Sequence, residues 1–277
     1  MDKHWKKYQG ALLWDGNPKK ETPTIEDAKE ALKESGAMFA RWTSNWDCGT
    51  PTEWWYCIKD TPFDINSISS NYRYKIHKGN KHFDVKIINP NEYIEDIYQV
   101  QVFAFSAYPE LYRPHINREI VKKSIADWQN GYIVFGAFEK ETQKLCGFTL
   151  IKESIGKVEL VSQRTIPQYE KLQVNAALVY GVVMHYNSLL SKDFYIVDGE
   201  RNIKHQTHFF EYLIKYFGFR LAYCNLNIVY SNRMHCAIKV LYPFMGGGKI
   251  IKKTKPIFIQ CLLRFIYGEN TTKFQIG

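Results

Sequence analysis

The residues best suited to acid–base chemistry form a polar cluster that follows a short apolar run. Phe194–Val197 has the length and composition of a buried strand, and Asp198, Glu200 and Arg201 come directly after it. His205 follows within a few residues, and histidine titrates near physiological pH. Charged side chains placed just beyond a buried strand indicate a reaction site. A local ion-pair network explains the same cluster equally well, and a lone histidine is more often structural.

An earlier apolar run leads into a helix that could bind an anion. Val158–Ile166 is typical of a strand and stops at Pro167, whereas Val174–Met184 has helical length and few charges. Parallel strands need such a crossover helix, and its N-terminus comes to the end of the preceding strand. Unpaired backbone N–H groups and the positive end of the helix dipole make that N-terminus a natural anion site. A helix turn without a ligand is the alternative.

Residues 157–219 thus have the order strand, turn, helix, strand, helix, and two motifs within them resemble a known superfamily. Pro167–Leu178 resembles the pyrophosphate loop of GNAT-type acyltransferases, where a proline, an aromatic residue and basic residues precede Ala-Leu. Lys215–Phe219 resembles the Gly-Phe ending of that superfamily's last core helix. Gln173 and Asn175 replace the family's glycines, a departure that is more typical of the FemAB-like branch.

The resemblance implies that an acyl-coenzyme A, acetyl-coenzyme A in the simplest case, binds as the acyl donor. Its pantetheine arm would pair with the backbone near Thr165, and its pyrophosphate would meet N–H groups at the start of the helix. Asn202 resembles the family's asparagine that contacts pantetheine, or else caps a helix. The cofactor-binding residues implied in this way are Thr165, Lys171, Leu172, Gln173, Val174, Asn175, Ala176 and Asn202.

The resemblance also implies transfer to an amine, which needs a base for the amine proton and an acid for the leaving thiolate. Glu159 lies on the strand where the family often carries a base, although a surface carboxylate explains it too. The family's acid tyrosine falls at Ile214, so nearby tyrosines would replace it. The residues implied for catalysis are Glu159, Asp198, Glu200, Tyr212 and Tyr216, and those implied for the acceptor are Arg201 and His205.

Composition is that of a soluble globular protein with an anionic partner. Of 277 residues, 45% are hydrophobic and 23% are charged, and the formal net charge is +9. This charge favours a polyphosphate cofactor or RNA, although a generally basic surface is an equal alternative. Six cysteines without a C-x-x-C pair indicate free thiols and no metal site. With no signal peptide and no membrane-length apolar run, we expect a cytoplasmic protein.

The remaining elements complete an α/β (α+β) fold. Thr24 and Gly36 bound a short helix, and Gly131–Ile151 is a clear hairpin. The order of aromatic strand, basic helix and strand over Trp54–Ile88 resembles the reduced first copy of the fold in FemAB-like proteins. We expect a GNAT-like mixed central sheet flanked by helices. Its parts would be an N-terminal subdomain (1–88), an acyltransferase core (89–245), and a basic tail and helix (246–277).

The sequence thus predicts an N-acyltransferase that moves an acyl group from acyl-coenzyme A to an amine. The acceptor would be a small molecule such as an amino sugar, or a cell-envelope precursor. One alternative is a FemAB-like aminoacyl transferase that takes its acyl group from aminoacyl-tRNA. Another is a catalytically inactive GNAT-like module that binds a partner through its aromatic N-terminal region.

Overall fold

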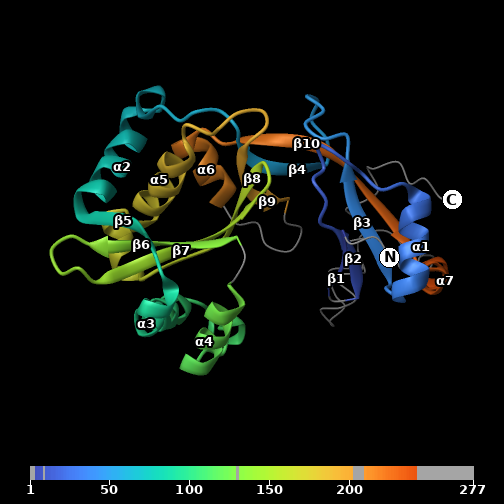
Figure 1. Ribbon diagram of the computed structural model, residues 1–277, viewed down its shortest axis with the longest axis horizontal. Coiled ribbons are helices and arrows are strands. Elements are labelled where there is room, and N and C mark those ends of the chain that lie inside the picture. Colours follow the sequence, from blue (N-terminus) through green and yellow to red (C-terminus); the bar gives the residue numbers. More distant parts are fainter. Residues whose placement is uncertain (1–3, 9, 129–130, 202–208, 242–277) are drawn as a thin grey trace. The chain divides into compact units, whose positions relative to one another are not determined.

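The computed structural model of the chain describes residues 4–8, 10–128, 131–201 and 209–241. The predictions made for Asn202, His205 and the C-terminal tail (246–277) therefore lie outside the described residues. The chain forms two compact units, each assembled from separate segments (Figure 1). The first unit takes the described residues within Met1–Tyr56, Glu200–Thr207 and Leu221–Gly277, and the second those within Cys57–Gly199 and His208–Arg220. The division predicted at residues 88 and 245 stays a prediction.

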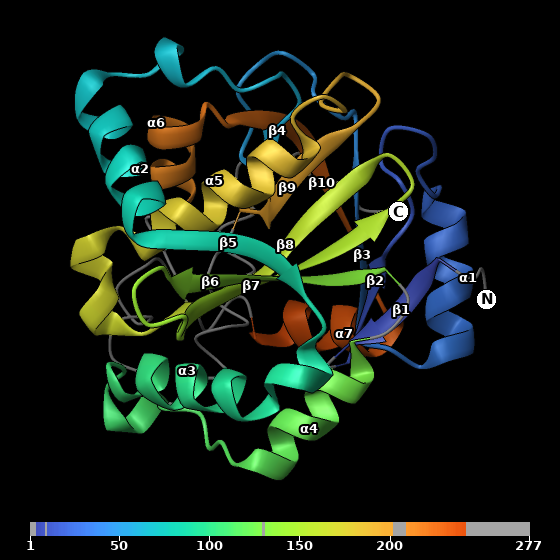
Figure 2. The same ribbon diagram turned by 60° about the vertical axis from the view of Figure 1, so that its left-hand side comes forward.

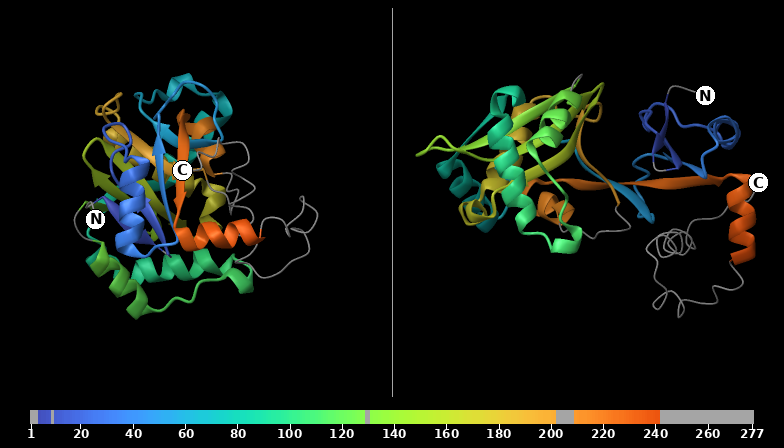
Figure 3. Two further views of the ribbon diagram at one scale, coloured as in Figure 1. Left: turned by 90° about the vertical axis from the view of Figure 1, so that its right-hand side faces the viewer. Right: turned by 90° about the horizontal axis from the view of Figure 1, so that it is seen from below.

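The first unit is built on a small mixed sheet. Strand β1 pairs antiparallel with β2, β2 pairs parallel with β3, and β3 pairs antiparallel with β10. Figure 3 shows β3 in blue beside β10 in orange, and helix α7 follows β10 along the chain. Helix α1 packs on β3 and covers a core that contains Trp5, Leu12 and Trp42. The bounds are β1 Trp5–Tyr8, β2 Ala11–Trp14, α1 Ile25–Ser35, β3 Phe39–Ser44, β10 Arg220–Tyr230 and α7 Asn232–Leu241.

Helix α1 begins and ends at the residues that the sequence predicts. The Thr24 hydroxyl accepts a hydrogen bond from the Asp27 backbone N–H (3.1 Å), and the Asp27 carboxylate accepts one from the Thr24 N–H (2.8 Å). This reciprocal pair is a capping box, which satisfies two backbone donors at the start of the helix. Gly36 ends the helix in the left-handed conformation at φ 63°, which glycine adopts without steric cost.

The second unit contains a larger mixed sheet in the order β5-β6-β7-β8-β9. Pairing is antiparallel from β5 to β8, and β8 then pairs parallel with β9. Strand β4 enters this unit at Cys57, and helix α5 is the crossover between β8 and β9. The bounds are β4 Trp54–Lys59, β5 Phe83–Ile88, β6 Tyr132–Glu139, β7 Leu145–Ser154, β8 Lys157–Thr165, α5 Val174–Tyr186 and β9 Tyr195–Glu200.

Helices cover both faces of the sheet in the second unit (Figure 2). Helix α5 packs on β5, β6 and β7, whereas α3 packs on β7 and β8. Successive side chains on β8 point to these two layers. Gln163 bonds Asn175 of α5, and the Arg164 guanidinium lies 5.3 Å from the Phe105 ring of α3. The helices and 3₁₀ turns are η1 Ile65–Ser67, α2 Ser70–His82, η2 Pro90–Tyr93, α3 Ile94–Ser106, η3 Glu110–Tyr112, α4 Arg118–Asp127, η4 Pro167–Leu172 and α6 Phe209–Phe217.

The mixed α/β fold with a large sheet flanked by helices is therefore confirmed. Strand β9 is longer than predicted, because it continues through Asp198 to Glu200 instead of ending at Val197. None of the helices in the described part of the chain is long and apolar enough to cross a membrane.

A glycine lets helix α2 lie directly against the first turn of α5. A Cβ atom on Gly79 would lie 2.7 Å from the Gln173 carbonyl oxygen and 3.1 Å from the Ala177 backbone nitrogen. Both atoms belong to the backbone, so they cannot rotate away as the end of a side chain can. Gly79 thus sets the distance between α2 and the helix start that the sequence predicts as an anion site.

Replacing Gly79 with alanine tests this contact, because the sign of the change in the free energy of unfolding depends on it. Alanine at a tolerant helical position stabilises by about 1 kcal/mol relative to glycine. Overpacking against a backbone atom costs about 1–3 kcal/mol instead, so we expect Gly79→Ala to lower the free energy of unfolding in urea. Exposed His77 on the same helix is the control, and His77→Ala should change stability by less than about 0.5 kcal/mol. A stabilised Gly79→Ala variant would contradict the close contact.

Candidate active site

The parallel pairing between β8 and β9 is short. Its register joins Lys157 to Tyr195, Val158 to Ile196 and Glu159 to Val197, and it ends there. Strand β8 continues to Thr165 and β9 to Glu200, so both strands extend beyond their last paired residues. The carboxyl ends of parallel strands lie at the same edge of a sheet, and ligands of open α/β sheets bind beyond such ends. The unpaired ends of β8 and β9 are therefore the candidate site.

An extra residue in β8 lies next to the end of this pairing. On the β7 side, the register changes from Leu150 opposite Ser162 to Ile151 opposite Leu160, which leaves Val161 as a bulge. A bulge bends its strand and increases the local twist. Because Val161 follows Glu159 by two residues, the bend provides a physical reason for β8 to leave β9 at this point.

Asp198 is the first residue of β9 beyond the paired register. Val197 is the neighbour of Glu159, so the next residues, Leu160 and Asp198, point to the opposite face. Leu160 pairs with Ile151, which shares a face with Thr149, and the Thr149 side chain bonds Gln163 on the α5 side. Asp198 is therefore on the face that α5 covers.

Asp198 is half-buried, and this changes its acid–base behaviour. Loss of hydration raises the pKa of its carboxyl group to about 7. Burial raises the pKa of the Cys57 thiol, and the charge of nearby Asp198 raises it further. A carboxyl group with a pKa near neutrality can both accept and return a proton, as general acid–base catalysis requires.

Glu159, the other predicted base, lies on the opposite face of the sheet. It is half-buried, and it sits between Lys152 of β7 and Val197 of β9 in the strand register. Burial and then the charge of Glu159 raise the pKa of Tyr195 to about 12. The structure therefore separates Glu159 from Asp198, and the two carboxylates cannot act from one side of the sheet.

The end of β8 and the start of α5 are joined by a chain of polar side chains. The Thr149 hydroxyl donates to Gln163 Oε1 (2.9 Å), and Gln163 Nε2 donates to Asn175 Oδ1 (2.8 Å). The Thr165 hydroxyl donates to the same Asn175 oxygen (3.3 Å). Thr165 and Asn175, both predicted to bind the cofactor, are thus brought together. Such a satisfied network fixes the helix start relative to the strand.

The residue before α5 has the left-handed backbone geometry that glycine adopts most easily. Gln173 is left-handed, at φ 68° and ψ 36°, and no side chain caps α5. The first N–H groups of a helix have no acceptor within it, so they remain available to an anion. Of the other predicted residues, Lys171 is exposed, Leu172 is half-buried, and Val174 and Ala176 are buried, with their backbone at this helix start.

Glu200 is held by donors within the first unit. Its carboxylate forms an ion pair with Arg41 and accepts hydrogen bonds from Trp54 Nε1 (3.0 Å) and the Tyr56 hydroxyl (3.2 Å). The Arg41 guanidinium also lies 5.4 Å from the Trp54 ring centre. Burial, and then the charge of Glu200, raises the pKa of Tyr56, so this phenol stays protonated and donates. Both carboxylate oxygens of Glu200 therefore have hydrogen-bond donors, and these contacts fix the position of the side chain.

Arg201 is paired as well. Its guanidinium lies 2.9 Å from Glu53 Oε2, and its backbone N–H donates to the Trp55 carbonyl oxygen (2.9 Å). Both side chains of this ion pair are about half exposed, so the pair contributes little to stability. The ion-pair network that the sequence left open therefore exists for Glu200 and Arg201.

The two predicted tyrosines of α6 lie together, with ring centres 4.3 Å apart. The Tyr212 hydroxyl is buried without a hydrogen-bond partner among the described residues, and burial raises its pKa. The Tyr216 hydroxyl accepts a hydrogen bond from Lys75 Nζ (2.8 Å) on α2. Of the two tyrosines, Tyr216 is thus the one whose hydroxyl has a hydrogen-bond partner in Lys75.

The sequence analysis did not identify the residues that contact the predicted site residues, although the pattern of one strand indicated two of them. Alternation along β4 places Trp54 and Tyr56 on one face, and both bond Glu200. The partners missed are Arg41, Trp54 and Tyr56 around Glu200, Thr149 and Gln163 beside Asn175, Cys57 near Asp198, and Lys75 at Tyr216.

These layers define a GNAT-like fold, in which a mixed sheet carries a crossover helix after the strand that leaves its parallel neighbour. Among solved structures, L-PGS from Bacillus licheniformis resembles the chain with a TM-score of 0.52 and 11% identity, over 88% of this chain and 85% of that one. FemX resembles it with a TM-score of 0.50 and 10% identity, over 78% of this chain and 72% of that one. At these identities the likeness concerns the fold. No protein-family model and no curated protein sequence matches the chain.

The raised pKa of Asp198 predicts a pH dependence of stability. Its folded-state value of about 7 lies above the ordinary value of 3.8, so the neutral carboxyl stabilises the fold fully below about pH 4. That contribution is lost as pH rises through 7. Between pH 5 and pH 8 the wild type should lose about 2–3 kcal/mol more than Asp198→Asn, measured by urea unfolding. Parallel curves for the two proteins would show that the carboxyl is not desolvated.

The anchoring of Glu200 predicts a stability cost on its removal. Glu200→Ala leaves Arg41, Trp54 and Tyr56 without their acceptor, and we expect a loss of about 2–3 kcal/mol in the free energy of unfolding. The control is Glu53→Ala at the half-exposed ion pair with Arg201, which should cost less than about 1 kcal/mol. Equal losses in the two variants would mean that the contacts of Glu200 are no stronger than a surface pair.

Proposed function

We propose that the chain transfers an acyl group to an amine, with Asp198 as the general base. The observation that carries this proposal is the position of Asp198, directly beyond the last β8–β9 pair, together with its pKa of about 7. An amine must be neutral to attack a carbonyl carbon, and it must lose a proton once the new bond forms. A carboxyl that is about half ionised at neutral pH accepts that proton efficiently.

The acyl donor in this proposal is an acyl-coenzyme A, used as a co-substrate. The β8 edge beyond Glu159 has backbone groups that β9 does not pair, and an extended pantetheine arm would bond them as an added strand does. The N–H groups at the start of α5 would bind the pyrophosphate, with Lys171 adding positive charge. The amine nitrogen attacks the thioester carbon, the carbon–sulfur bond breaks, and the amine proton passes to Asp198.

The leaving thiolate needs a proton, and Tyr216 is the better of the two predicted donors. Its hydroxyl contacts the Lys75 ammonium, which can return a proton to it, whereas the Tyr212 hydroxyl is buried without a partner among the described residues. Glu200 and Arg201 keep their contacts within the first unit and have no part in this step. We propose an acceptor of the amino-sugar or cell-envelope precursor type.

Aminoacyl transfer of the FemAB-like type is the second candidate, and the fold comparison favours it. The two solved structures described above are L-PGS and FemX, and the C-terminal domain of a lysylphosphatidylglycerol synthetase from Agrobacterium fabrum has a TM-score of 0.50 at 10% identity. The net charge of +9 suits a tRNA donor as well as coenzyme A. The chemistry at Asp198 is the same for both donors, since each presents an activated acyl carbonyl.

A thermal-shift panel separates the donors. A ligand that binds only the folded state raises the melting temperature, and the rise grows with the logarithm of the ligand concentration relative to Kd. We expect stabilisation by acetyl-coenzyme A or a longer acyl-coenzyme A. We expect none by adenosine, which lacks the pyrophosphate and pantetheine. Stabilisation by aminoacyl-tRNA alone, lost as salt rises, would replace coenzyme A with tRNA as the donor. A protein that none of these ligands stabilises would favour an inactive binding module.

The base assignment is tested by a pH–rate profile with the donor that the panel selects. Wild-type kcat/KM should fall as pH drops below about 7, because protonation removes the free carboxylate. Asp198→Asn should lower the rate by about 10²–10³-fold and abolish that limb of the profile. Glu159→Gln, on the opposite face, is the matched control and should retain the limb. Unchanged turnover in Asp198→Asn would remove Asp198 from the chemistry.

A further inference from the structure

Strand β5 is the outer strand of the sheet in the second unit, and one of its edges has no partner strand in the described part of the chain. It pairs with β6 alone, and Figure 2 shows it in front of β6 and β7. A strand edge of this kind presents backbone N–H and C=O groups to any strand that can lie beside it. The edge of β5 is therefore a surface on which a further strand can pair.

The register with β6 determines which backbone groups of β5 point outward. The Lys140 N–H donates to the His82 carbonyl oxygen (2.9 Å), so these two residues form a hydrogen-bonded pair of the antiparallel ladder. Such pairs recur at every second residue, so the even-numbered residues of β5 bond β6. The backbone groups of Val85 and Ile87 consequently point away from β6, and none of the described residues bonds them there.

The side chains of this edge carry opposite charges two residues apart. Asp84 and Lys86 are both exposed, and they lie on the same face of the sheet because side chains alternate along a strand. The Lys86 ammonium lies 4.5 Å from the centre of the Phe138 ring, and Phe138 is the β6 residue opposite Asp84. Charges of one sign at an edge would repel a second copy of the strand, whereas this pair can attract one.

A two-fold axis beside Val85 gives an antiparallel register of two β5 strands that suits both the backbone and the charges. The outward groups of the two Val85 residues lie opposite each other and exchange two hydrogen bonds. Asp84 of each copy then lies opposite Lys86 of the other, at non-hydrogen-bonded positions, where side chains approach most closely. A shift of two residues in either direction would place Asp84 opposite Asp84 or Lys86 opposite Lys86.

Apolar side chains on the other face of β5 support the same register. Val85 lies on the α5 side, because a Cβ atom on Gly181 of α5 would lie 2.5 Å from Val85 Cγ1. Ile87 shares this face and is 47% exposed. In the two-fold register Ile87 lies opposite Phe83 of the second copy. Pairs of a β-branched and an aromatic residue are favourable across antiparallel strands.

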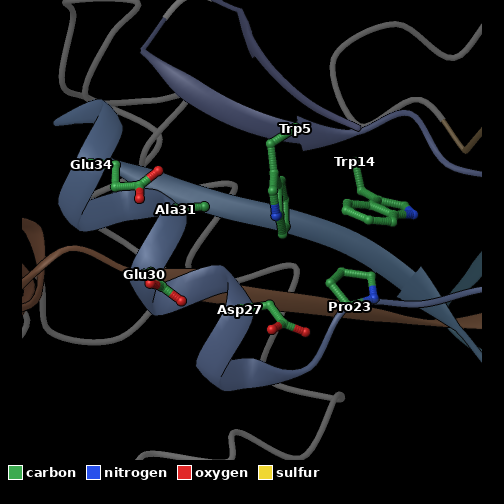
Figure 4. Close-up of a pocket in the computed structure, with 7 residues that line it drawn as sticks. All are labelled: Trp5, Trp14, Pro23, Asp27, Glu30, Ala31 and Glu34. Carbon is green, nitrogen blue, oxygen red and sulfur yellow. The ribbon is translucent and has the colours of Figure 1, made fainter. Parts of the chain in front are cut away.

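The outer strand of the first unit, β1, lacks this complementarity. Its exposed Lys6 and Lys7 have the same charge, so a second copy of β1 would bring lysines together. The Trp5 ring of β1 points toward α1, where Figure 4 shows it with Ala31 at a small pocket within the unit. Of these two outer strands, β5 is thus the one that suits a second copy.

We propose that two copies of the chain pair through β5 and form a dimer with a continuous sheet. The partner is a second copy because the charges of this edge complement themselves under two-fold symmetry, as an isologous interface requires. Strands β6 and β7 separate β5 from β8 in the sheet. The proposal is therefore independent of the transfer reaction.

Sedimentation velocity of the full chain at about 1–100 µM tests the proposal. We expect a species of twice the chain mass of 32.6 kDa. Asp84→Lys brings two ammonium groups together at each end of the paired region and should weaken dimerisation at least about tenfold. Lys86→Asp should have the same effect by bringing carboxylates together. Asp127→Lys, the same change of charge at an exposed position of α4, is the control and should leave the dimer unchanged.

A mixture of the two single variants tests the register itself. The Asp84→Lys and Lys86→Asp proteins each repel their own kind, but one of each restores both attractive pairs, so we expect a dimer from the mixture. Far-UV circular dichroism establishes that each variant is folded. A wild type that stays monomeric at every concentration would overturn the proposal. A dimer that neither variant weakens, or weakened variants that do not associate when mixed, would overturn it as well, because the interface would not be this one.

Discussion

Parallel hydrogen bonding between β8 and β9 stops after three residue pairs, and the candidate active site depends on that early end. Beyond Glu159 and Val197, the facing backbone groups of the two strands have no partner in each other. Buried backbone groups must be satisfied, so this edge requires a ligand, water or another segment. The bulge at Val161 provides the bend, and the tight turn through Pro167–Leu172 returns the chain into α5. An activated acyl group bound here would lie beside Asp198.

The start of α5 combines an unfavourable backbone conformation with contacts that support it. A non-glycine residue at positive φ costs roughly 1 kcal/mol or more, and Gln173 occupies that conformation. The surrounding contacts compensate: Asn175 accepts bonds from Gln163 and Thr165, and Gly79 lets α2 press on the same turn. A helix start fixed on two sides keeps its N–H groups in place without a flexible glycine loop.

Charge has different roles in the two units. Asp198 is half-buried, and desolvation raises the pKa of its carboxyl group to about 7. Glu200 has a guanidinium and two neutral donors, which fix its position. The carboxyl groups of Asp198 and Glu200 thus differ in their properties because their surroundings differ.

Local signals in the sequence determined much of the fold. The Thr24 cap and Gly36 bound α1, alternation and a polar turn predict β6 and β7, and an apolar run before Pro167 predicts β8, because these features act over a few residues. Tertiary structure decided the rest. The contact between Arg41 and Glu200 joins residues 159 positions apart, and the faces of Glu159 and Asp198 depend on the strand register and on one bulged residue. Register is a property of paired strands, so a single strand's sequence does not specify it.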